Sequence, residues 1–258
     1  RPALPEDHDA PLERRAPSAK ETAMTYTVLG RCHRTGRLGI GIATFSITVG
    51  RYCYGVKSNA GVTVSQAFAN ERNNQLALRL LSQGFTAGSV LQQLLANDPY
   101  FEYRQIGVID RSGTAVAHTG PRTRGWSSHV TGENYVAFGN GLVGQEVVDA
   151  IAAGFLAEPD ADLEHRLLMG IEAGRDAGGQ GTRERHKAER SAALRVYSTD
   201  TFADIDLRVD LHATAVEELR RVWTEYKQYE AYYRDRERNP SGATGQEDFM
   251  KTLRAAEA

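Results

Sequence analysis

Runs of apolar and small residues separated by short polar turns open the main part of the chain and predict paired β-strands. Such residues run from Thr25 through Tyr26, Val28 and Leu29, and again through residues 38–43. The four residues His-Arg-Thr-Gly at 33–36 lie between the two runs and are typical of a tight turn. The same order of strand, glycine turn and strand returns at 104–110 and 114–118. The pattern predicts two hairpins, and further strands at 61–66 and 135–138.

Apolar residues at helical spacing predict the elements that follow these strands. One helix begins near Leu76 and ends at Gly84, and a second runs from Thr86 to the stop at Pro99. Two more apolar faces lie within residues 147–155 and 163–176. We expect the two hairpins to build two sheets packed face to face, with the helices of 75–97 and 144–176 on their outer faces.

The C-terminal part of the chain carries a long aromatic pattern. From Thr214 a helix is predicted in which Trp223, Tyr226, Tyr229 and Tyr233 recur at helical spacing. This stretch is too long and too aromatic for a free surface helix. We therefore interpret its distal half as a contact that joins copies of the chain into a homo-oligomer, followed by a polar linker and a short terminal helix.

Composition limits the number of domains and the classes of partner. The chain has 258 residues, of which 41% are hydrophobic and 25% charged, enough to bury one full core. We divide it into residues 1–24, a disordered extension or propeptide, residues 25–223, the main domain, and residues 224–258, a helical extension. The 31 basic and 33 acidic residues give no electrostatic reason for binding nucleic acid or an anionic membrane. A small-molecule partner fits this balance better.

The expected compartment follows from the apolar runs and the cysteines. No run approaches the roughly 20 apolar residues of a membrane helix, and the charged, proline-rich start is unlike a secretory signal. We therefore expect a cytoplasmic protein. Cys32 and Cys53 form neither a metal motif nor a disulfide framework, and both are expected in the core.

Thr25 is the first candidate for chemistry because it directly follows Met24 at the start of the first strand. If the chain begins at Thr25, its hydroxyl can attack a carbonyl carbon while its own free α-amine accepts the hydroxyl proton, since such an amine has a pKa of about 7.7–8.0. Nucleophile and base then belong to one residue. Threonine also opens many strands for purely structural reasons.

An ordered set of short motifs supports the catalytic interpretation. It comprises Thr25-Tyr26-Thr27-Val28, Gly36-Arg37-Leu38-Gly39, Ser46 to Gly50, Ser65-Gln66-Ala67-Phe68 with Asn70, Arg104-Gln105, Thr119-Gly120, His129 to Gly132, Gly139-Asn140, Ala177-Gly178-Gly179, Ser191 to Leu194, and Asp206 to Asp210 with His212. With this set the chain resembles an uncharacterised bacterial family of the N-terminal nucleophile (Ntn) hydrolase superfamily, a domain of unknown function whose members typically open Thr-Phe-Ser-Ile. The resemblance covers residues 25 to about 223.

The resemblance implies an α+β fold, namely a four-layer αββα sandwich of two mainly antiparallel sheets, and hydrolysis of an amide-type bond without a metal or other cofactor. Thr25 is then the nucleophile. Asn140, between a strand and a helix start, suits an oxyanion donor, although asparagine also caps helices. We expect substrate contacts from Ser46, Gln66, Asn70, Arg104 and His118, while Gln66 and Asn70 could equally cap the next helix.

Three features depart from the family pattern or allow a second interpretation. Gln180 and Arg190 stand where the family usually has aspartate and glutamine. This departure means either that the substrate or the activity has changed or that residues 180–189 simply form a solvated loop. We favour the solvated loop. Strict alternation at 206–212 places Asp206, Asp210 and His212 on one strand face. Since Arg208 lies between the carboxylates, a salt-bridge ladder is favoured there over a metal site.

The leading hypothesis is hydrolysis of a carbon–nitrogen amide or cyclic-amide bond of a small molecule through an acyl-enzyme on Thr25. A variant of this chemistry passes the acyl group to an amine, which makes the protein an acyl transferase or cyclase. The rival hypothesis is a catalytically silent binding or assembly protein that keeps the fold without a free Thr25. The sequence leaves the substrate and the number of subunits open.

Overall fold

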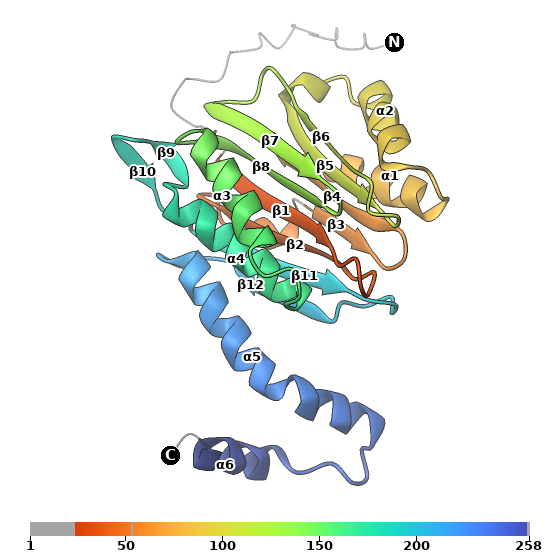
Figure 1. The fold of residues 1–258 in the computed structure, drawn as a ribbon, viewed down its shortest axis with the longest axis vertical. Helices are drawn as coiled ribbons and strands as arrows, with labels where there is room; N and C mark the ends of the chain where they lie inside the picture. Colours follow the sequence, from red (N-terminus) through yellow and green to blue (C-terminus); the bar gives the residue numbers. More distant parts are fainter. Residues whose placement is uncertain (1–23, 53, 257–258) are drawn as a thin grey trace, which may run out of the picture.

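The computed structural model describes residues 24–52 and 54–256, which fold into two antiparallel β-sheets and six α-helices (Figure 1). This is a mixed α+β fold. The expected extension 1–24, apart from Met24, and the expected burial of Cys53 lie outside the described residues. Cys32 is buried, as expected. No helix in the described ranges combines the length and hydropathy that crossing a membrane requires.

The larger sheet contains the first predicted hairpin near its centre. Its strand order is β10-β9-β8-β1-β2-β11-β12, and β7 pairs with β8 as well. The strands are β1 (Thr25–Arg31), β2 (Leu38–Thr44), β7 (Trp126–Gly132), β8 (Tyr135–Leu142), β9 (Gln180–Thr182), β10 (Arg185–Lys187), β11 (Ser191–Tyr197) and β12 (Ile205–Val209). β1 thus lies between β8 and β2, far from either edge of the sheet.

The smaller sheet contains the second predicted hairpin. Its order is β3-β4-β5-β6, built from β3 (Tyr54–Lys57), β4 (Gly61–Ala67), β5 (Arg104–Asp110) and β6 (Ala115–Thr119). Both hairpins are confirmed by their antiparallel registers. The short strand β3 and the strand β7 had not been predicted.

Three apolar clusters hold the elements together. One lies between the two sheets and joins Leu29 and Phe138 of the larger sheet to Val62 and Ile109 of the smaller one. The sheets approach closely because β5 has Gly107 at this contact, where an added Cβ would come within 2.9 Å of the Phe138 ring. The second cluster joins the larger sheet to helices, and the third joins the smaller sheet to helices.

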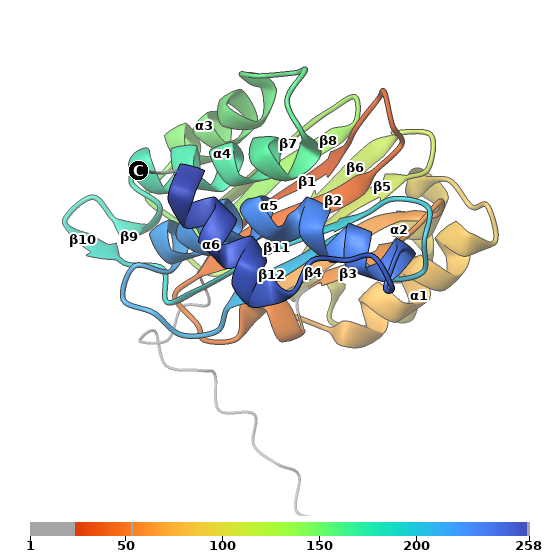
Figure 2. The same ribbon diagram turned by 90° about the horizontal axis from the view of Figure 1, so that it is seen from below.

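The helices follow their apolar faces. α1 (Glu71–Ser82) and α2 (Ala87–Asn97) pack on the smaller sheet, whereas α3 (Gln145–Leu156) and α4 (Leu163–Asp176) pack on the larger one (Figures 1 and 2). Two short 3₁₀ helices cover Val49–Arg51 and Phe101–Tyr103. Side-chain caps begin both helices on the smaller sheet: Asn70 accepts from the backbone N–H of Arg72 at 3.1 Å, and Thr86 accepts from that of Ser89 at 3.3 Å.

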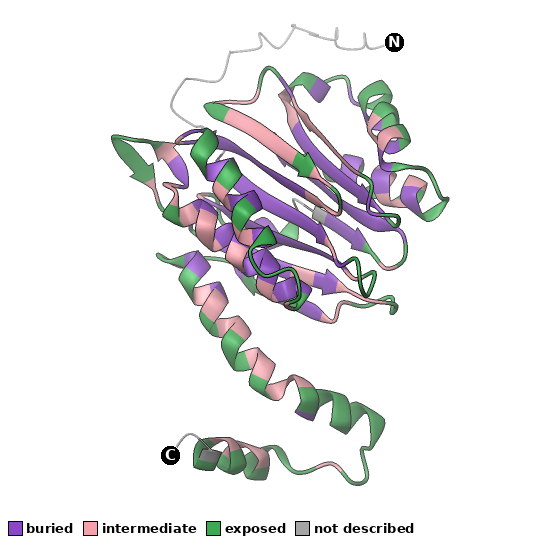
Figure 3. Ribbon diagram, viewed as in Figure 1, coloured by how far each residue is buried: buried purple, intermediate pink, exposed green. Residues whose placement is uncertain are grey.

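The C-terminal segment forms α5 (Ala215–Arg238) and α6 (Gln246–Ala256). α5 is one continuous helix, so the expected boundary at 223/224 falls inside it. Its first turns are buried against the larger sheet, and the rest extends away with mostly exposed or half-buried residues (Figure 3). There the Tyr232 ring stacks on Phe249 of α6, with 4.2 Å between centroids. The aromatic stripe thus has a partner in its own chain, and the homo-oligomer stays a prediction.

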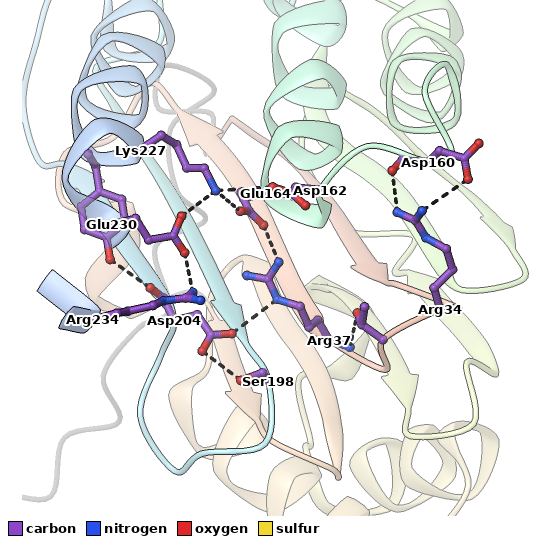
Figure 4. A network of polar contacts seen from close by, with 12 residues as sticks. Arg34, Arg37, Asp160, Asp162, Glu164, Ser198, Asp204, Lys227, Glu230 and Arg234 are labelled. Atoms are coloured by element: carbon purple, nitrogen blue, oxygen red, sulfur yellow. Dashed lines mark hydrogen bonds and ion pairs between the residues drawn. The ribbon is translucent and has the colours of Figure 1, made fainter. Parts of the chain in front are cut away.

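Ion pairs fix the middle of α5 to the domain (Figure 4). Glu164, at the start of α4, has a side chain only 1% exposed, and it accepts hydrogen bonds from Arg37 at 2.9 Å and from Lys227 at 3.1 Å. Lys227 also donates to Glu230 at 2.6 Å. Burial alone would lower the pKa of Lys227, but the hydrogen bonds to Glu230 and Glu164 and their charges outweigh it and raise that pKa.

Two sequence expectations are corrected in the larger sheet. The strand at 206–212 ends at Val209, and Asp206 pairs with Arg195 of the neighbouring strand at 2.6 Å, so only Arg208 and Asp210, 3.8 Å apart, remain of the expected ladder. Residues 180–187 form the β9–β10 hairpin instead of an irregular loop, although most of their side chains are exposed.

Candidate functional site

A row of polar residues crosses the larger sheet at the start of β1. Strand register places Ser127, Asn140, Thr25, Thr44 and Ser191 opposite one another on β7, β8, β1, β2 and β11. Residues paired in this way point to the same face of a sheet. The neighbouring row consists of residues such as Phe138 and Ile42, which belong to the core between the sheets. The polar row therefore faces the smaller sheet, at one end of that core.

The Thr25 hydroxyl is buried and its proton has a defined partner. Thr44 has one hydroxyl proton and donates it to the Met24 carbonyl oxygen at 2.5 Å. The 3.1 Å contact between the Oγ1 atoms of Thr25 and Thr44 must then be donated by Thr25. The hydroxyl of Thr44 thus contacts both the nucleophile candidate and the carbonyl of the bond that precedes it.

A chain of hydrogen-bonded, buried side-chain amides links the two sheets next to Thr25. Thr27 donates to Gln66 Oε1 at 2.6 Å, and Gln66 Nε2 donates to Gln105 Oε1 at 2.9 Å. Asn140 Nδ2 donates to the same Gln105 oxygen at 3.1 Å. Gln66, Gln105 and Asn140 are all fully buried. Gln66 and Asn140, both expected at the site, are therefore brought together, and Gln105 connects them.

The orientation of these amides follows from two backbone carbonyls. Gln105 Nε2 lies 2.8 Å from Gly139 O and 3.1 Å from Ser128 O, which can only accept hydrogen bonds. This end of Gln105 must be the NH₂ group, so its oxygen faces Gln66 and Asn140, and both must present NH₂ groups to it. The Oδ1 atom of Asn140 is left buried without a hydrogen-bond partner among the described residues.

Two other expected residues form a separate cluster. Asn70 and Arg104 both donate to Asp98 Oδ2, at 3.1 and 2.9 Å, and Asn73 donates to it at 2.8 Å. Burial alone would raise the pKa of Asp98, but hydrogen bonds from Arg104 and Asn73 hold it well below its usual range. The cluster borders a surface hollow of about 500 Å³ lined also by Arg72 and Tyr100. No hydrogen bond recorded for the described residues joins Asn70 or Arg104 to Thr25.

The remaining expected contacts are Ser46 and His118. Ser46 lies beside the polar row: its N–H donates to Thr44 Oγ1 at 3.2 Å, and its carbonyl accepts from Ser191 at 2.8 Å. His118 is elsewhere, stacked on Phe101 at 4.2 Å. Burial lowers its pKa. The histidine that contacts the amide chain is His129, whose Nδ1 lies 2.9 Å from Thr119 Oγ1, itself the acceptor of a Gln105 hydrogen bond.

Two hydrogen bonds hold the Gln180 side chain near the polar row. Its Oε1 accepts from the N–H of Phe45 at 2.8 Å, and its Nε2 donates to Glu189 at 3.0 Å. Gln180 is fully buried and Glu189 nearly so. Burial and the nearby Glu189 carboxylate raise the pKa of Tyr26 well above its ordinary value. Arg190 extends over the Phe45 ring, 5.5 Å from its centroid.

Sequence reasoning gave no site role to three contributors, namely Thr44, Gln105 and Ser191, although the last two lie in motifs of the family resemblance. Each is a fully or almost fully buried polar residue in a strand that otherwise supplies apolar residues to the core. A polar residue at an inward position of such a strand is the signal that could have marked them. Among the described residues, no group of three or more histidine, cysteine, aspartate or glutamate side chains is placed to hold a metal ion.

Comparison with known proteins assigns the family. A model of a family of unknown function, DUF1028, matches residues 25–219. The chain belongs to this family. A crystal structure of a Silicibacter pomeroyi protein described by the same family is 27% identical, with a TM-score of 0.71 over 79% of this chain and 89% of that one. The DUF1028 fold therefore extends over most of the present chain.

A second solved structure is more distant. Anbu (ancestral beta-subunit) from Yersinia bercovieri is 14% identical, with a TM-score of 0.36 over 78% of this chain and 94% of that one. A likeness at this level carries no conclusion about the present protein. No curated protein matches the chain.

Proposed function

We propose that this DUF1028 protein is an Ntn-type hydrolase that cleaves a carbon–nitrogen amide or cyclic-amide bond of a small molecule. In this proposal the two sheets and their outer helices are the four-layer αββα sandwich of that superfamily. Thr25 is the nucleophile, and its α-amine, once free, is the general base.

The observation that carries the proposal is the position of Thr25. It begins a central strand, and its hydroxyl lies in a row of polar residues, all buried except the half-buried Ser127, that meets the amide chain between the two sheets. Burying so many polar groups costs free energy unless every group is well paired, so a core built for stability alone would favour apolar residues there. The middle member of this row is Thr25, which combines a hydroxyl with an α-amine once it is the first residue of the chain.

The reaction follows from these groups. The Thr25 oxygen attacks the substrate carbonyl carbon while the α-amine takes the hydroxyl proton, and the carbon–nitrogen bond breaks as that proton passes to the leaving nitrogen. Water then attacks the resulting ester, and the Thr25 hydroxyl is restored as the acid leaves. An amine in place of water would give the acyl transferase or cyclase variant.

The chain with Met24 attached cannot use this base, because the nitrogen of Thr25 is then an amide and essentially non-basic. The structure supports removal of the preceding residues by the chain itself. The Thr44 hydroxyl donates to the Met24 carbonyl and thereby draws electron density from the carbon that the Thr25 hydroxyl would attack. In that step the bond between Met24 and the Thr25 nitrogen breaks as this nitrogen takes up the hydroxyl proton, and water then hydrolyses the resulting ester of Thr25 to release residues 1–24.

The test compares the full chain, a chain begun at Met24, and the variants Thr25→Ala and Thr25→Ser. Intact mass should show Thr25 as the first residue in the two parent chains, whereas Thr25→Ala should keep residues 1–24 in the full chain. In a screen of small amides and cyclic ureides, chains that keep Met24 should turn over more slowly than cut chains. The rate should fall by about 10²- to 10⁴-fold, the contribution typical of general-base catalysis. Thr25→Ala should fold normally and be inactive, and Thr25→Ser should retain part of the activity.

Equal turnover by Thr25→Ala, or full turnover by chains proven to retain Met24, would reject this mechanism. Acid products with water alone support the hydrolase, and new amides formed only with added amines support the transferase. The rival, a silent binding or assembly protein, is favoured by Gln180 and Arg190, which stand where the resembled family usually has aspartate and glutamine. It predicts uncut, inactive chains in every arm of the test.

A further inference from the structure

The side chain of Asn140 has one buried atom without a hydrogen-bond partner among the described residues, and that atom is an acceptor. Its Nδ2 group is held by Gln105, whose own orientation is dictated by the carbonyls of Ser128 and Gly139. Gln105 takes one of the two Nδ2 protons of Asn140, and turning the amide over would place its oxygen against the oxygen of Gln105. The free atom is therefore Oδ1, buried and without a partner in the described part of the chain.

The nitrogen of Thr25 points toward the strand that carries Asn140. At the other end of β1, the N–H of Arg31 donates to the Asn134 carbonyl across from it, at 2.8 Å. In an antiparallel pair, N–H groups that face the same neighbour recur at every second residue. Thr25 is six residues before Arg31, so its nitrogen also faces β8, where its register partner is Asn140.

The number of protons on this nitrogen changes when the bond to Met24 is cut. As an amide it carries one proton, which the strand ladder can satisfy. As a free ammonium group it carries three protons and needs further acceptors. An unpaired buried acceptor on the facing residue of the neighbouring strand matches that need, and it costs free energy for as long as it stays unpaired.

We propose that Asn140 Oδ1 accepts a hydrogen bond from the α-amine of Thr25 once that amine is free, and that Gln105 is the positioning residue that holds Asn140 in this orientation. The inference rests on the proposed function, in which the α-amine of Thr25 is the general base. It gives Asn140 Oδ1 the task of orienting the base, and it leaves the second Nδ2 proton for the oxyanion role expected of Asn140.

The measurable consequence concerns the amine. A neutral acceptor binds an ammonium group more strongly than an amine, so Asn140 raises the pKa of the Thr25 amine. Other titratable or charged groups around this end of β1 are Tyr26 on β1, His129 on β7, and Glu189 and Arg190 before β11. Lys187 of β10 lies over the Phe45 ring beside Arg190. All of these are left unchanged in every variant.

The probe is periodate, which attacks an N-terminal threonine only when its α-amine is unprotonated. It cleaves the bond between the carbon that carries the amine and the carbon that carries the hydroxyl. The pH dependence of this cleavage, followed by intact mass, reports the pKa of the Thr25 amine alone. The full chain is used for each variant that removes residues 1–24 by itself. Otherwise Thr25 is exposed by a protease from a chain carrying a cleavable leader before it, so the measurement does not depend on any hydrolase activity.

The variants are Asn140→Leu, Asn140→Asp and Gln105→Leu, with Thr63→Val as the matched control. The Thr63 hydroxyl is also fully buried and has no hydrogen-bond partner among the described residues. Thr63 and Gln66 share β4 but lie three positions apart, so Thr63 points to the opposite face of the strand from the amide chain. Asn140→Leu should lower the amine pKa by about one unit, and Gln105→Leu should lower it by less. Asn140→Asp should raise it, and Thr63→Val should leave it at the wild-type value.

An amine pKa that stays at the wild-type value in both Asn140→Leu and Asn140→Asp overturns the inference. If Asn140→Leu does not fold, Asn140→Asp decides alone, because a carboxylate next to the amine must shift its pKa. Failure of the proposed function shows differently. The amine pKa then responds to Asn140 as described, yet no amide is hydrolysed, or the natural chain is never cut before Thr25.

Discussion

Replacing Asp98 by asparagine tests whether the Asn70–Arg104 cluster is structural or binds substrate. The Asp98 side chain is 2% exposed, and that of its ion-pair partner Arg104 is 13% exposed. Asp98 Oδ2 accepts from Asn70, Asn73 and Arg104, and Oδ1 accepts from the N–H of Tyr100 at 2.9 Å. Asparagine keeps the shape, removes the charge, and places an NH₂ group against at least one of these donors.

The cost can be estimated from these contacts. Breaking a buried ion pair typically costs about 3–5 kcal/mol, and Arg104 retains some access to water, so we expect a loss of about 3 kcal/mol in the free energy of unfolding. For a domain of this size that corresponds to a fall of roughly 6–12 °C in Tm. Asp160→Asn is the matched control, because the Asp160 side chain is 89% exposed and its ion pair with Arg34 should contribute at most about 1 kcal/mol.

Acid adds a second check with a defined sign. The folded pKa of Asp98 lies well below its unfolded value of about 3.9, so its stabilising contribution is present above about pH 4 and is lost as the pH falls through the folded pKa. Denaturant unfolding at pH 7 should therefore separate wild type from Asp98→Asn, and the difference should shrink below pH 4. The structural interpretation is refuted if Asp98→Asn unfolds like Asp160→Asn while substrate binding weakens.

Two further predictions concern α5 and its partners. Glu164→Gln should lower the free energy of unfolding by about 2 kcal/mol at pH 7, because it leaves Lys227 and Arg37 without their shared carboxylate. Since the folded pKa of Lys227 is raised, its contribution to the free energy of unfolding is complete below about pH 10 and is lost at higher pH. If denaturant titrations show that Glu164→Gln costs the same free energy at pH 7 and pH 12, this account is contradicted. Deleting residues 239–258 removes α6 and exposes the Tyr232 ring, so the shortened chain should aggregate or bind a hydrophobic dye. Unchanged elution from a sizing column and unchanged dye binding would show that the rest of α5 needs no such cover.

Local pattern and turn chemistry determined much of the fold from sequence. Both hairpins lie where the turns at 33–36 and 111–113 predicted them. The helices on the two sheets lie close to their predicted limits, except that α1 begins at Glu71, five residues before the predicted start near Leu76. These features depend on neighbours within a few residues along the chain, so sequence contains them directly. Strand β7 was missed because its residues are half-buried or exposed and mostly small or polar, which weakens the alternating signal.

Local residues also identified Thr25, since its special chemistry belongs to one residue and the bond before it. Its surroundings were decided by tertiary structure. Strand register brings Thr44 to Thr25 and Ser191 to Thr44, and Gln105 meets Gln66 and Asn140 across the space between the two sheets. Asn70 and Arg104 were drawn instead to Asp98, a residue with no family signal. Which buried polar group lies beside which depends on strand pairing between residues far apart in the chain, such as Thr44 of β2 and Ser191 of β11, which are 147 positions apart. Such pairing exists only once the sheet has formed.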